Sequence, residues 1–393
     1  MNKGIDMFKA TMTNKLLKSL KNIEYGSLEL ITPDGRAHKF EGESSGPNTH
    51  IHIRDWDVFT NLSLRGDVAL AEDYRDGKWN TPNLQNVLLF GLRNMESLHT
   101  FIYGNRFLAA LSNVAYKLRM NTLNGSKKNI QEHYDLGNHF YQLWLDPSMT
   151  YSSAIFKSEH EKLSDAQRNK YDRILDRLGD DPQNILEVGC GWGGFAERAV
   201  LTKNHKVKGI TLSEEQHDFA KLRLSTLPAE IVLEDYRHQQ GLYDAIVSIE
   251  MFEAVGEDFW PVYFEKLKSL LKKDGKAVIQ TITIDEAHFD RYRKGSDIIR
   301  SYIFPGGMLP SKSRFAQEAQ KAGLKVTDQY CFGQDYAKTL GIWLEKFDQV
   351  QSQLPQHGFD EKFSRLWRFY LASCMAGFET GRTDVMQVEL QHA

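Results

Sequence analysis

The sequence predicts an α/β protein in which a doubly wound, mainly parallel sheet follows a small α+β domain. From about residue 160 onward, short apolar runs alternate with segments of helical periodicity, a pattern typical of parallel strands joined by crossover helices. The first of these runs leads into a glycine-rich loop at 189–194, which is where a Rossmann-like sheet receives its ligand. Near the N-terminus, two strand-like runs flank the turn signature Pro33-Asp34-Gly35. The chain therefore combines two regions of different architecture.

The α/β region is expected to contain five strands and the helices that connect them. Short apolar runs indicate buried strands, and longer amphipathic segments indicate helices. We expect strands at 184–188, 207–212, 230–233, 245–249 and 275–284, and helices at 195–202, 214–227 and 260–271. Roughly the last 60 residues are rich in aromatic side chains and have a helical pattern.

The N-terminal region predicts an α+β domain followed by a linker. Its expected elements are a hairpin at 26–41, a strand at 48–57, and helices at 57–78 and 82–96. The expected organisation is an N-terminal domain at 1–95 for lipid engagement or dimerisation, a helical linker at 96–130 and a catalytic domain at 131–393. The linker is amphipathic and basic, so it either packs between the domains or contacts an anionic membrane surface.

Composition excludes several classes of protein. The chain has 393 residues and a formal net charge of -3, which provides no global basic field for binding nucleic acid. No apolar stretch reaches the length of a membrane span, and the first residues lack the apolar core of a signal peptide, so we expect a cytoplasmic protein. The three cysteines, Cys190, Cys331 and Cys374, have neither metal-binding spacing nor a disulfide framework, and we expect no metal site.

The glycine-rich loop points to the cofactor. Its spacing, Gly189-x-Gly191-x-Gly193, differs from the Gly-x-Gly-x-x-Gly of a dinucleotide site, and Glu187 precedes it by two residues. This arrangement resembles class I methyltransferases, and the resemblance implies that Glu187 orders the turn and meets the cationic amino end of S-adenosylmethionine. The alternative is a Rossmann domain that binds another nucleotide or none.

Polar residues at the ends of the next two strands extend this candidate site. Thr211 and Gln216 offer hydrogen bonds where many Rossmann sites have an acid for the ribose. Ser213 is also a natural N-cap for the following helix, with Gln216 as its capping-box partner. After the third strand, the carboxylate of Asp235 and the ring of Tyr236 are candidates for holding the adenine.

Several separated motifs together resemble the cyclopropane-fatty-acyl-phospholipid synthases and the related mycolic acid methyltransferases. The motifs occur in the family's order over roughly residues 130–345, and the segment 69–79 resembles the family's N-terminal domain more weakly. They are His133-Tyr134-Asp135-Leu136-Gly137-Asn138, Met149-Thr150-Tyr151-Ser152, the loop at 187–194, and the segments at 209–216, 250–256, 302–307 and 332–336. The cofactor-binding candidates that these motifs add are Tyr151, Ser152, Cys190, Leu212 and Ile249.

The resemblance implies a reaction at the cis double bond of a phospholipid acyl chain, with S-adenosylhomocysteine as by-product. An alkene is a poor nucleophile, so the site must supply proximity, a dry channel and stabilisation of a developing carbocation. Aromatic faces attract cations, and the candidates are Tyr134, Phe252, Phe304 and Tyr336. Core packing is the alternative role for Phe252 and Phe304.

Closing a three-membered ring requires a base. The resemblance implies a bound bicarbonate, held at positions that correspond to Ser153, Glu253, Gln280, Ile282 (through its backbone) and Tyr336. Three departures from the family pattern occur here: Ser153 replaces a cysteine, Gln280 a histidine and Ala254 another histidine. Serine and glutamine still hydrogen-bond an anion, but losing a cationic histidine changes the proton path. Cyclopropane formation and C-methylation to a methyl- or methylene-branched chain therefore both stay open.

The resemblance also sets the expected partners. It implies a protein bound peripherally to the inner face of the membrane, acting on unsaturated phospholipids, with a homodimer as one function of its N-terminal domain. Two alternatives keep the fold: a methyltransferase for a soluble metabolite, and a lipid-binding protein that binds the cofactor without turnover. The substitutions at Ser153 and Gln280 motivate the second, and the intact Glu187, Glu253 and Tyr336 argue against it.

Overall fold

The computed structural model describes residues 2–102, 136–181, 183–295 and 297–393, and the chain divides into two compact units. Each unit is described by itself. The first comprises Met1–Leu118, Lys294–Ile303 and Phe347–Thr380. The second comprises Arg119–Arg293, Phe304–Lys346 and Gly381–Ala393. Two segments from within the range 131–393 therefore belong to the same unit as the N-terminal residues.

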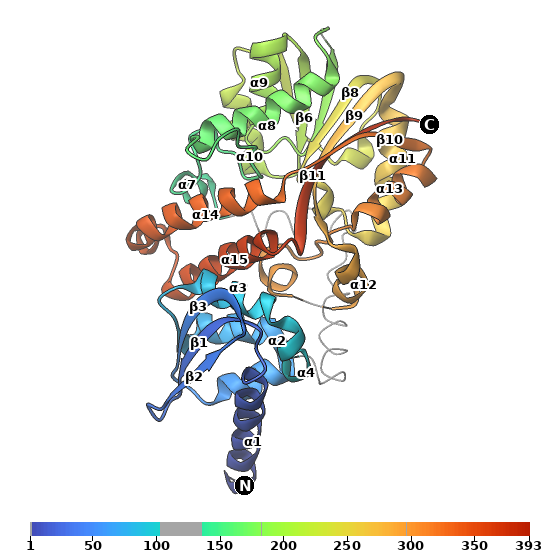
Figure 1. Cartoon of the computed structure of the whole chain (residues 1–393). Coiled ribbons are helices and arrows are strands. Elements are labelled where there is room, and N and C mark those ends of the chain that lie inside the picture. The colour runs from blue at the N-terminus through green and yellow to red at the C-terminus, as the bar shows by residue number, and fades with distance from the viewer. Residues whose placement is uncertain (1, 103–135, 182, 296) are drawn as a thin grey trace. The chain divides into compact units, whose positions relative to one another are not determined.

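The second unit is built on a seven-stranded sheet with the order β10-β11-β9-β8-β5-β6-β7 (Figure 1). β5 to β9 are parallel, whereas β11 runs antiparallel to both of its neighbours, β9 and β10. The strands are β5 (Asn184–Val188), β6 (Lys206–Thr211), β7 (Ala229–Leu233), β8 (Tyr243–Ile249), β9 (Leu271–Ile284), β10 (Leu324–Cys331) and β11 (Thr383–His392). This doubly wound sheet confirms the predicted α/β fold class.

Helices cover both faces of this sheet because its strands bury apolar side chains on both sides. Ile185 and Val247 pack with α8, α9 and α10, whereas Leu186 and Ile246 face the cluster formed with α11 and α13. The helices of the unit are α7 (Asn138–Gln142), α8 (Leu163–Leu178), α9 (Gly194–Lys203), α10 (Glu214–Arg223), α11 (Trp260–Leu270), α12 (Glu286–Lys294), α13 (Lys312–Lys321) and the first part of α14 (Gly333–Val350). Short helical turns lie at Tyr236–His238, Phe252–Ala254 and Glu257–Phe259.

The C-terminal part of the chain differs from the helical pattern that we expect for its last 60 residues. α14, the turn Gln351–His357 and α15 (Glu361–Glu379) are helical, but the chain ends in the central strand β11. The sequence hides this strand because β11 is buried on both faces and carries the buried polar residues Gln387 and Glu389. Arg173 donates to Gln387 and Arg177 to Glu389, which compensates their burial.

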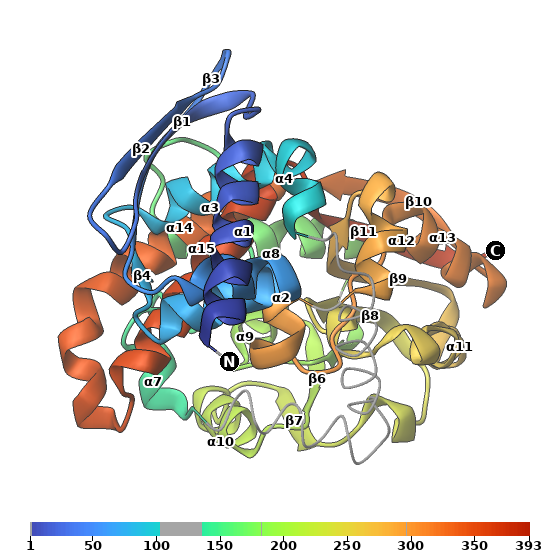
Figure 2. The ribbon, with the colours of Figure 1, turned by 90° about the horizontal axis from the view of Figure 1, so that it is seen from below.

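The first unit contains a smaller sheet with the order β2-β1-β3-β4, which Figure 2 shows beside α1. The predicted hairpin is confirmed, because β1 and β2 pair antiparallel around Gly35, whose φ is +81°. β3 adds to β1 in parallel, and β4 pairs with β3. The elements are α1 (Asn2–Leu20), β1 (Tyr25–Ile31), β2 (Ala37–Glu41), β3 (Ser44–Ile53), α2 (Asp57–Arg75), β4 (Trp79–Asn80), α3 (Leu84–Arg93) and α4 (Met95–Ile102), together with the turn Ile299–Ile303 and α15.

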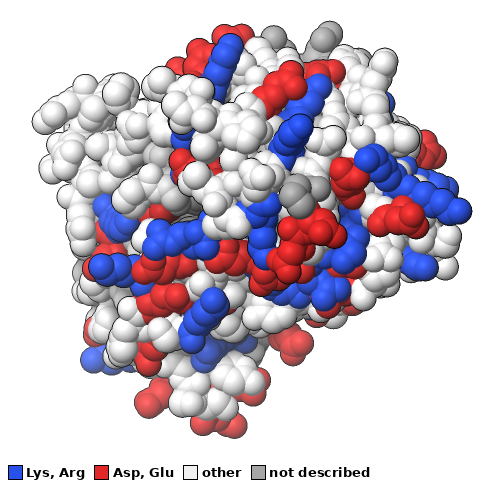
Figure 3. All heavy atoms as spheres, turned by 90° about the horizontal axis from the view of Figure 1, so that it is seen from above, with Lys and Arg blue, Asp and Glu red and all other residues white. Residues whose placement is uncertain are grey.

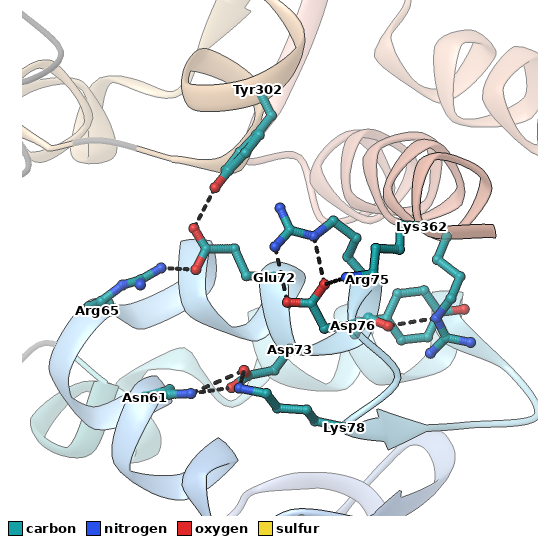
Figure 4. Close-up of polar contacts among 11 residues, drawn as sticks. Asn61, Arg65, Glu72, Asp73, Arg75, Asp76, Lys78, Tyr302 and Lys362 are labelled. Carbon is teal, nitrogen blue, oxygen red and sulfur yellow. Dashed lines mark hydrogen bonds and ion pairs between the residues drawn. The ribbon is translucent and has the colours of Figure 1, made fainter. Parts of the chain in front are cut away.

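Polar contacts explain why two late segments belong to the first unit (Figure 4). The hydroxyl of Tyr302 donates to the carboxylate of Glu72 on α2. Lys362, in the first turn of α15, pairs with Asp76 at 3.2 Å. The guanidinium of Arg365 donates to the backbone carbonyl of Tyr74 at 2.6 Å. These contacts attach residues that are more than 200 positions away in sequence to α2.

The predicted linker is only partly described. Its first residues form α4, and the rest, from 103 to 130, lies outside the described residues together with the motif residues His133 and Tyr134. In the part of the chain that the structure covers, no helix is both long and apolar enough to cross a membrane.

Candidate functional site

The candidate site lies where the strand order of the large sheet reverses. β6 and β7 lie on one side of β5, and β8 and β9 lie on the other. In doubly wound sheets, ligands bind outside the carboxyl ends of the strands at this switch point. The residues that follow β5 and β8, Gly189 and Glu250, stand at that edge.

The glycine loop at this edge has the backbone of a ligand cradle. Gly189 and Gly193 have φ values of +82°, in the left-handed region that glycine adopts without strain. The backbone N–H groups of Gly189 and Cys190 both donate to the carbonyl of Ile210, at 3.0 Å each, which fixes the loop against β6. Gly193 then caps the N-terminus of α9. The loop therefore places backbone without side chains at the edge of the sheet, where a ligand can approach it closely.

Gly189→Ala is expected to disturb this loop. An added Cβ would lie 2.7 Å from Cγ of Met251, and the left-handed backbone disfavours alanine. We expect a loss of stability of about 1–3 kcal/mol and about tenfold weaker binding of S-adenosylhomocysteine. Chemical denaturation and calorimetric titration measure the two effects.

Gly35→Ala is the matched control for this substitution. Gly35 has a similar φ of +81° but nothing within 4 Å of an added Cβ, and it lies in the hairpin of the first unit. The control should lose stability without losing cofactor affinity. Unchanged affinity in the Gly189 variant would contradict the role of the loop.

Glu187 provides the acid expected before the loop. It is 2% exposed at the end of β5, and its Oε2 atom has no hydrogen-bond partner among the described residues. Burial raises the pKa of Glu187 well above its ordinary value, although Lys170, Arg223 and the backbone N–H of Ala196 act in the opposite direction. A buried carboxyl oxygen without a described partner, beside a bare-backbone cradle, fits the cationic amino group of S-adenosylmethionine.

The end of β6 is held by its own side chains. Ser213 accepts from the backbone N–H of Gln216 at 3.2 Å, which confirms the predicted N-cap. The second bond of a capping box, from the N–H of Ser213 to the side chain of Gln216, is absent between these two residues. Thr211 lies between them instead: its hydroxyl donates to the Gln216 side chain at 2.8 Å and accepts from the N–H of Ser213 at 3.2 Å. Leu212, between Thr211 and Ser213 in the chain, is half-buried.

The candidates for adenine binding have structural partners as well. The carboxylate of Asp235 accepts from the backbone N–H of Arg237 at 2.9 Å and from its guanidinium at 2.6 Å. Burial alone would raise the pKa of Asp235, but these bonds to Arg237 lower it. The ring of Tyr236 lies edge-on against Tyr263 at 5.5 Å. Asp235 is thus an ionised acceptor with a fixed orientation, and its contact with adenine stays a prediction.

The segment Tyr151-Ser152-Ser153 forms a wall of the site. The ring of Tyr151 lies 5.4 Å from Trp343 and 5.6 Å from Trp144, in a cluster of aromatic rings. Ser152 accepts a hydrogen bond of 2.6 Å from the buried ammonium of Lys170. Burial lowers the pKa of Lys170 to about 7, although the carboxylates of Glu250 and Glu187 favour its charged form. Lys170 therefore lies close to both acids at the edge of the sheet.

Three residues predicted to hold an anion converge on Glu250, which sequence reasoning missed as a site residue. Its Oε1 atom accepts from the backbone N–H of Ser153 and from the side-chain amide of Gln280, both at 2.8 Å. Its Oε2 atom accepts from the hydroxyl of Tyr336 at 2.6 Å. The hydroxyl of Ser153 itself donates to the carbonyl of Ala154 at 3.1 Å. The one available signal was an acid placed directly after the fourth strand.

The conformation of Glu250 is unusual. Its φ is +50°, a left-handed value that costs a non-glycine residue about 1–2 kcal/mol. Strain of this kind is concentrated at functional sites. Gln280 is oriented towards Glu250 because its own Oε1 accepts from Gln387 at 3.0 Å. Burial raises the pKa of Glu250, and the bond from Tyr336 and the charge of Lys170 partly oppose that rise.

Glu253 has hydrogen-bond partners of its own, and its charge interacts with that of Glu250. Its Oε1 atom accepts from the backbone N–H of Ile282 and from the hydroxyl of Thr281. Its Oε2 atom is buried and has no partner in the described part of the chain. Burial, and secondly the charge of Glu250, raise the pKa of Glu253 to about 8. Glu253 and Ile282 thus pair with each other, while the other predicted anion-binding residues face Glu250.

Glu253→Gln is expected to change how stability depends on pH. The pKa of Glu253 is raised in the folded state, so the folded protein binds more protons than the unfolded chain between its ordinary pKa of 4.5 and about 8. This group therefore makes the wild type progressively less stable as pH rises through that window. The variant should lack this decline, as urea denaturation at several pH values would show. A wild type and variant with parallel pH profiles would contradict the raised pKa.

The structure places the other predicted residues as follows. Phe252 is fully buried and stacks on Trp260 with ring centres 5.5 Å apart, so it belongs to the core. Phe304 is half-buried in the loop before α13, and Ile249 is half-buried at the end of β8. Cys190 is buried in the glycine loop, and burial raises the pKa of its thiol. Tyr134 lies outside the described residues.

Comparison with known proteins identifies relatives of this chain. A family model described as mycolic acid cyclopropane synthetase matches residues 122–388. Tuberculostearic acid methyltransferase UfaA1 of Mycobacterium tuberculosis is 34% identical over 395 residues, covering 96% of this chain and 90% of that protein. Cyclopropane-fatty-acyl-phospholipid synthase of Escherichia coli K12 is 33% identical over 344 residues, covering 86% of each.

Solved structures agree with this relationship. The cyclopropane synthase MmaA2 from Mycobacterium tuberculosis has a TM-score of 0.64 and 31% identity, and the match covers 67% of this chain and 97% of that one. The mycolic acid cyclopropane synthase CmaA1, solved with SAH and CTAB, has a TM-score of 0.63 and 33% identity over 67% of this chain and 98% of that one.

Proposed function

Because this chain belongs to the mycolic acid cyclopropane synthetase family and is an S-adenosylmethionine-dependent methyltransferase, we propose that it methylates a double-bond carbon of an unsaturated phospholipid acyl chain. The observation that carries the proposal is that two acidic side chains and several aromatic rings lie together at the edge of the sheet where the glycine loop stands. Glu187 and Glu250 stand there, and the rings of Tyr151, Trp343 and Tyr336 lie beside them. Such a site suits an apolar acceptor that becomes cationic.

The residues divide into two groups by role. Glu187 and the backbone of the loop at 189–193 would hold the cofactor, with Thr211 and Asp235 as further polar contacts. The bound cofactor supplies an electrophilic methyl group. The aromatic wall excludes water and offers π-faces to the carbocation that arises on the acyl chain, while the acids balance its charge.

A methyl- or methylene-branched chain is the product that we favour. Gln280 stands where the resemblance implies a histidine. Its side-chain amide donates to Glu250 and accepts from Gln387. Position 280 therefore does not provide the cationic histidine that the resemblance implies beside a bound bicarbonate. The relative that aligns over 96% of this chain is named a tuberculostearic acid methyltransferase.

Cyclopropane formation is the second candidate. The Escherichia coli relative that bears this name is 33% identical over 86% of this chain. Both products add one CH₂ to the mass of the fatty acid, so mass alone does not separate them. The acids that receive the proton are compatible with either outcome, because a cyclopropane, a methylene branch and a methyl-branched alkene are each completed by proton loss.

Product structure in cells that express the protein tests this proposal. Fatty acids are extracted and analysed by mass spectrometry, and those that gain a CH₂ are examined by NMR and by ozonolysis. We expect branched chains derived from the host's monounsaturated fatty acids, and unchanged saturated chains. NMR signals of a cyclopropane ring would favour the second candidate, and no modified lipid at all would reject both.

We further propose that the protein acts at a membrane surface, since its acceptor would lie in a bilayer. Lysine and arginine are interspersed with acidic residues on the face drawn in Figure 3, so that face offers no uniform basic field. The basic linker at 96–130 is the candidate for membrane contact. Co-sedimentation with anionic and neutral vesicles tests binding, and analytical ultracentrifugation tests for the homodimer.

A further inference from the structure

We propose that the carboxylate of Glu250 is a built-in base, which removes the proton released after methyl transfer and makes a bound bicarbonate unnecessary. This inference rests on the proposed function. It assigns a role to a residue that the family resemblance does not name. It also accounts for the departures at Ser153 and Gln280 as parts of one altered pocket.

The hydrogen bonds around Glu250 are those of an anion site that is already filled. The backbone N–H of Ser153, the amide of Gln280 and the hydroxyl of Tyr336 supply three donors to its two oxygens. Ser153 and Gln280 are fully buried, and Tyr336 is 7% exposed, so these donors have little access to water. A small anion at this place would compete with a carboxylate that is covalently attached.

The placement of Glu250 allows contact with an acceptor. It follows β8 directly, at the switch point of the sheet, and the charge of Lys170 interacts with both Glu250 and Glu187. The residue as a whole is half-buried, whereas Glu187 is 2% exposed. Its left-handed backbone, with φ of +50°, is retained although glycine would adopt it freely. A side chain is therefore held there against a local preference for glycine.

The proposed step is balanced in atoms and electrons. Methyl transfer leaves a positive charge on the acyl chain, and a C–H bond then breaks, either on a chain carbon next to the cationic carbon or on the transferred methyl group. The proton goes to the Glu250 carboxylate, and the bonding pair becomes the new carbon–carbon bond of an alkene or a ring. The protonated carboxyl releases this proton to solvent before the next turnover.

The charged groups around Glu250 predict how the rate of this step depends on pH. The hydroxyl of Tyr336 and the charge of Lys170 favour the ionised carboxylate, whereas burial opposes it, and the charge of Glu250 in turn raises the pKa of Glu253. Burial raises the pKa of Glu250, so a larger share of the enzyme carries the base as pH increases. Turnover should rise with pH through that pKa.

Three variants of the full-length protein test the assignment. Glu250→Gln keeps the shape but accepts no proton, Glu250→Gly relieves the backbone and leaves space for an added anion, and Glu265→Gln is an exposed control on α11. Transfer of labelled methyl to monounsaturated phospholipid vesicles is measured in bicarbonate-depleted buffer, with and without added formate or bicarbonate. Binding of S-adenosylhomocysteine is measured for each variant.

We expect wild-type turnover to be independent of bicarbonate, and Glu250→Gln to be about 100-fold slower with cofactor affinity within about threefold of wild type. Formate or bicarbonate should restore turnover to Glu250→Gly but not to Glu250→Gln. Wild-type dependence on bicarbonate, a Glu250→Gln variant that keeps a third of its turnover or loses cofactor binding, or an unrescued glycine variant would each overturn the inference. If the wild type methylates no unsaturated lipid, the proposed function fails instead, and this inference fails with it.

Discussion

Glu187→Gln is expected to weaken binding of S-adenosylhomocysteine by about a thousandfold, which corresponds to about 4 kcal/mol. Glu187 is buried, and its Oε2 atom has no partner within the described residues. An ammonium group placed there without a carboxylate would be a buried charge without compensation. Isothermal titration calorimetry of the purified variant measures the loss.

The same site predicts a dependence on pH. The pKa of Glu187 is raised, so the ligand-free carboxyl holds its proton to a higher pH than usual and must release it to pair with an ammonium. Wild-type affinity should therefore increase with pH, and the increase should be absent in the variant. Glu230→Gln, an exposed substitution on β7, is the matched control. Equal affinity of Glu187→Gln and the control would show that Glu187 does not hold the cofactor.

Lys170→Met is expected to reduce turnover at neutral pH about tenfold and to move the pH profile of activity upward by about one unit. The ammonium of Lys170 favours the ionised forms of both Glu187 and Glu250. Without it, both carboxyls should hold their protons to higher pH. Steady-state methyl transfer measured across pH gives the shift directly.

The effect of Lys170→Met on stability should be small by comparison. Burial outweighs the attraction of the acids, as the lowered pKa of about 7 shows, so a methionine of similar length replaces a group that is costly to bury. Because the folded state binds fewer protons at Lys170 than the unfolded chain between pH 7 and 10.5, wild-type stability should rise with pH across that window. The variant should lack this rise, and Lys221→Met, on the exposed side of α10, should retain it. An unshifted activity profile in Lys170→Met would contradict the coupling of the three groups.

The sequence predicted the features that depend on local patterns. The run at 184–188 coincides with β5, and the glycine-rich loop predicted after it is present, with left-handed backbone at Gly189 and Gly193. The hairpin around Gly35 and the N-cap at Ser213 were predictable for the same reason, since a turn or cap is fixed by a few neighbouring residues.

The features that were missed depend on segments that meet only in the folded chain. Glu250 gains its role from donors on three separate segments, at Ser153, Gln280 and Tyr336. β11 was missed because it is a central strand with buried polar residues and lacks the apolar–polar alternation of a half-exposed strand. The aromatic pattern around Phe252 left cation binding and core packing open, and its full burial against Trp260 decides for packing.

Methyl transfer from trideuteromethyl-labelled S-adenosylmethionine to purified vesicles is the most direct test of the proposed chemistry. Vesicles of monounsaturated phospholipid are incubated with the purified full-length protein, matched saturated vesicles serve as the control, and released fatty acids are analysed by mass spectrometry. We expect a deuterated carbon attached to a former double-bond carbon of the unsaturated chains, with one deuterium lost if the proton leaves the transferred methyl group and none lost if it leaves the chain. Deuterium found in no lipid, or equally in the saturated vesicles, would contradict methylation of an acyl-chain double bond.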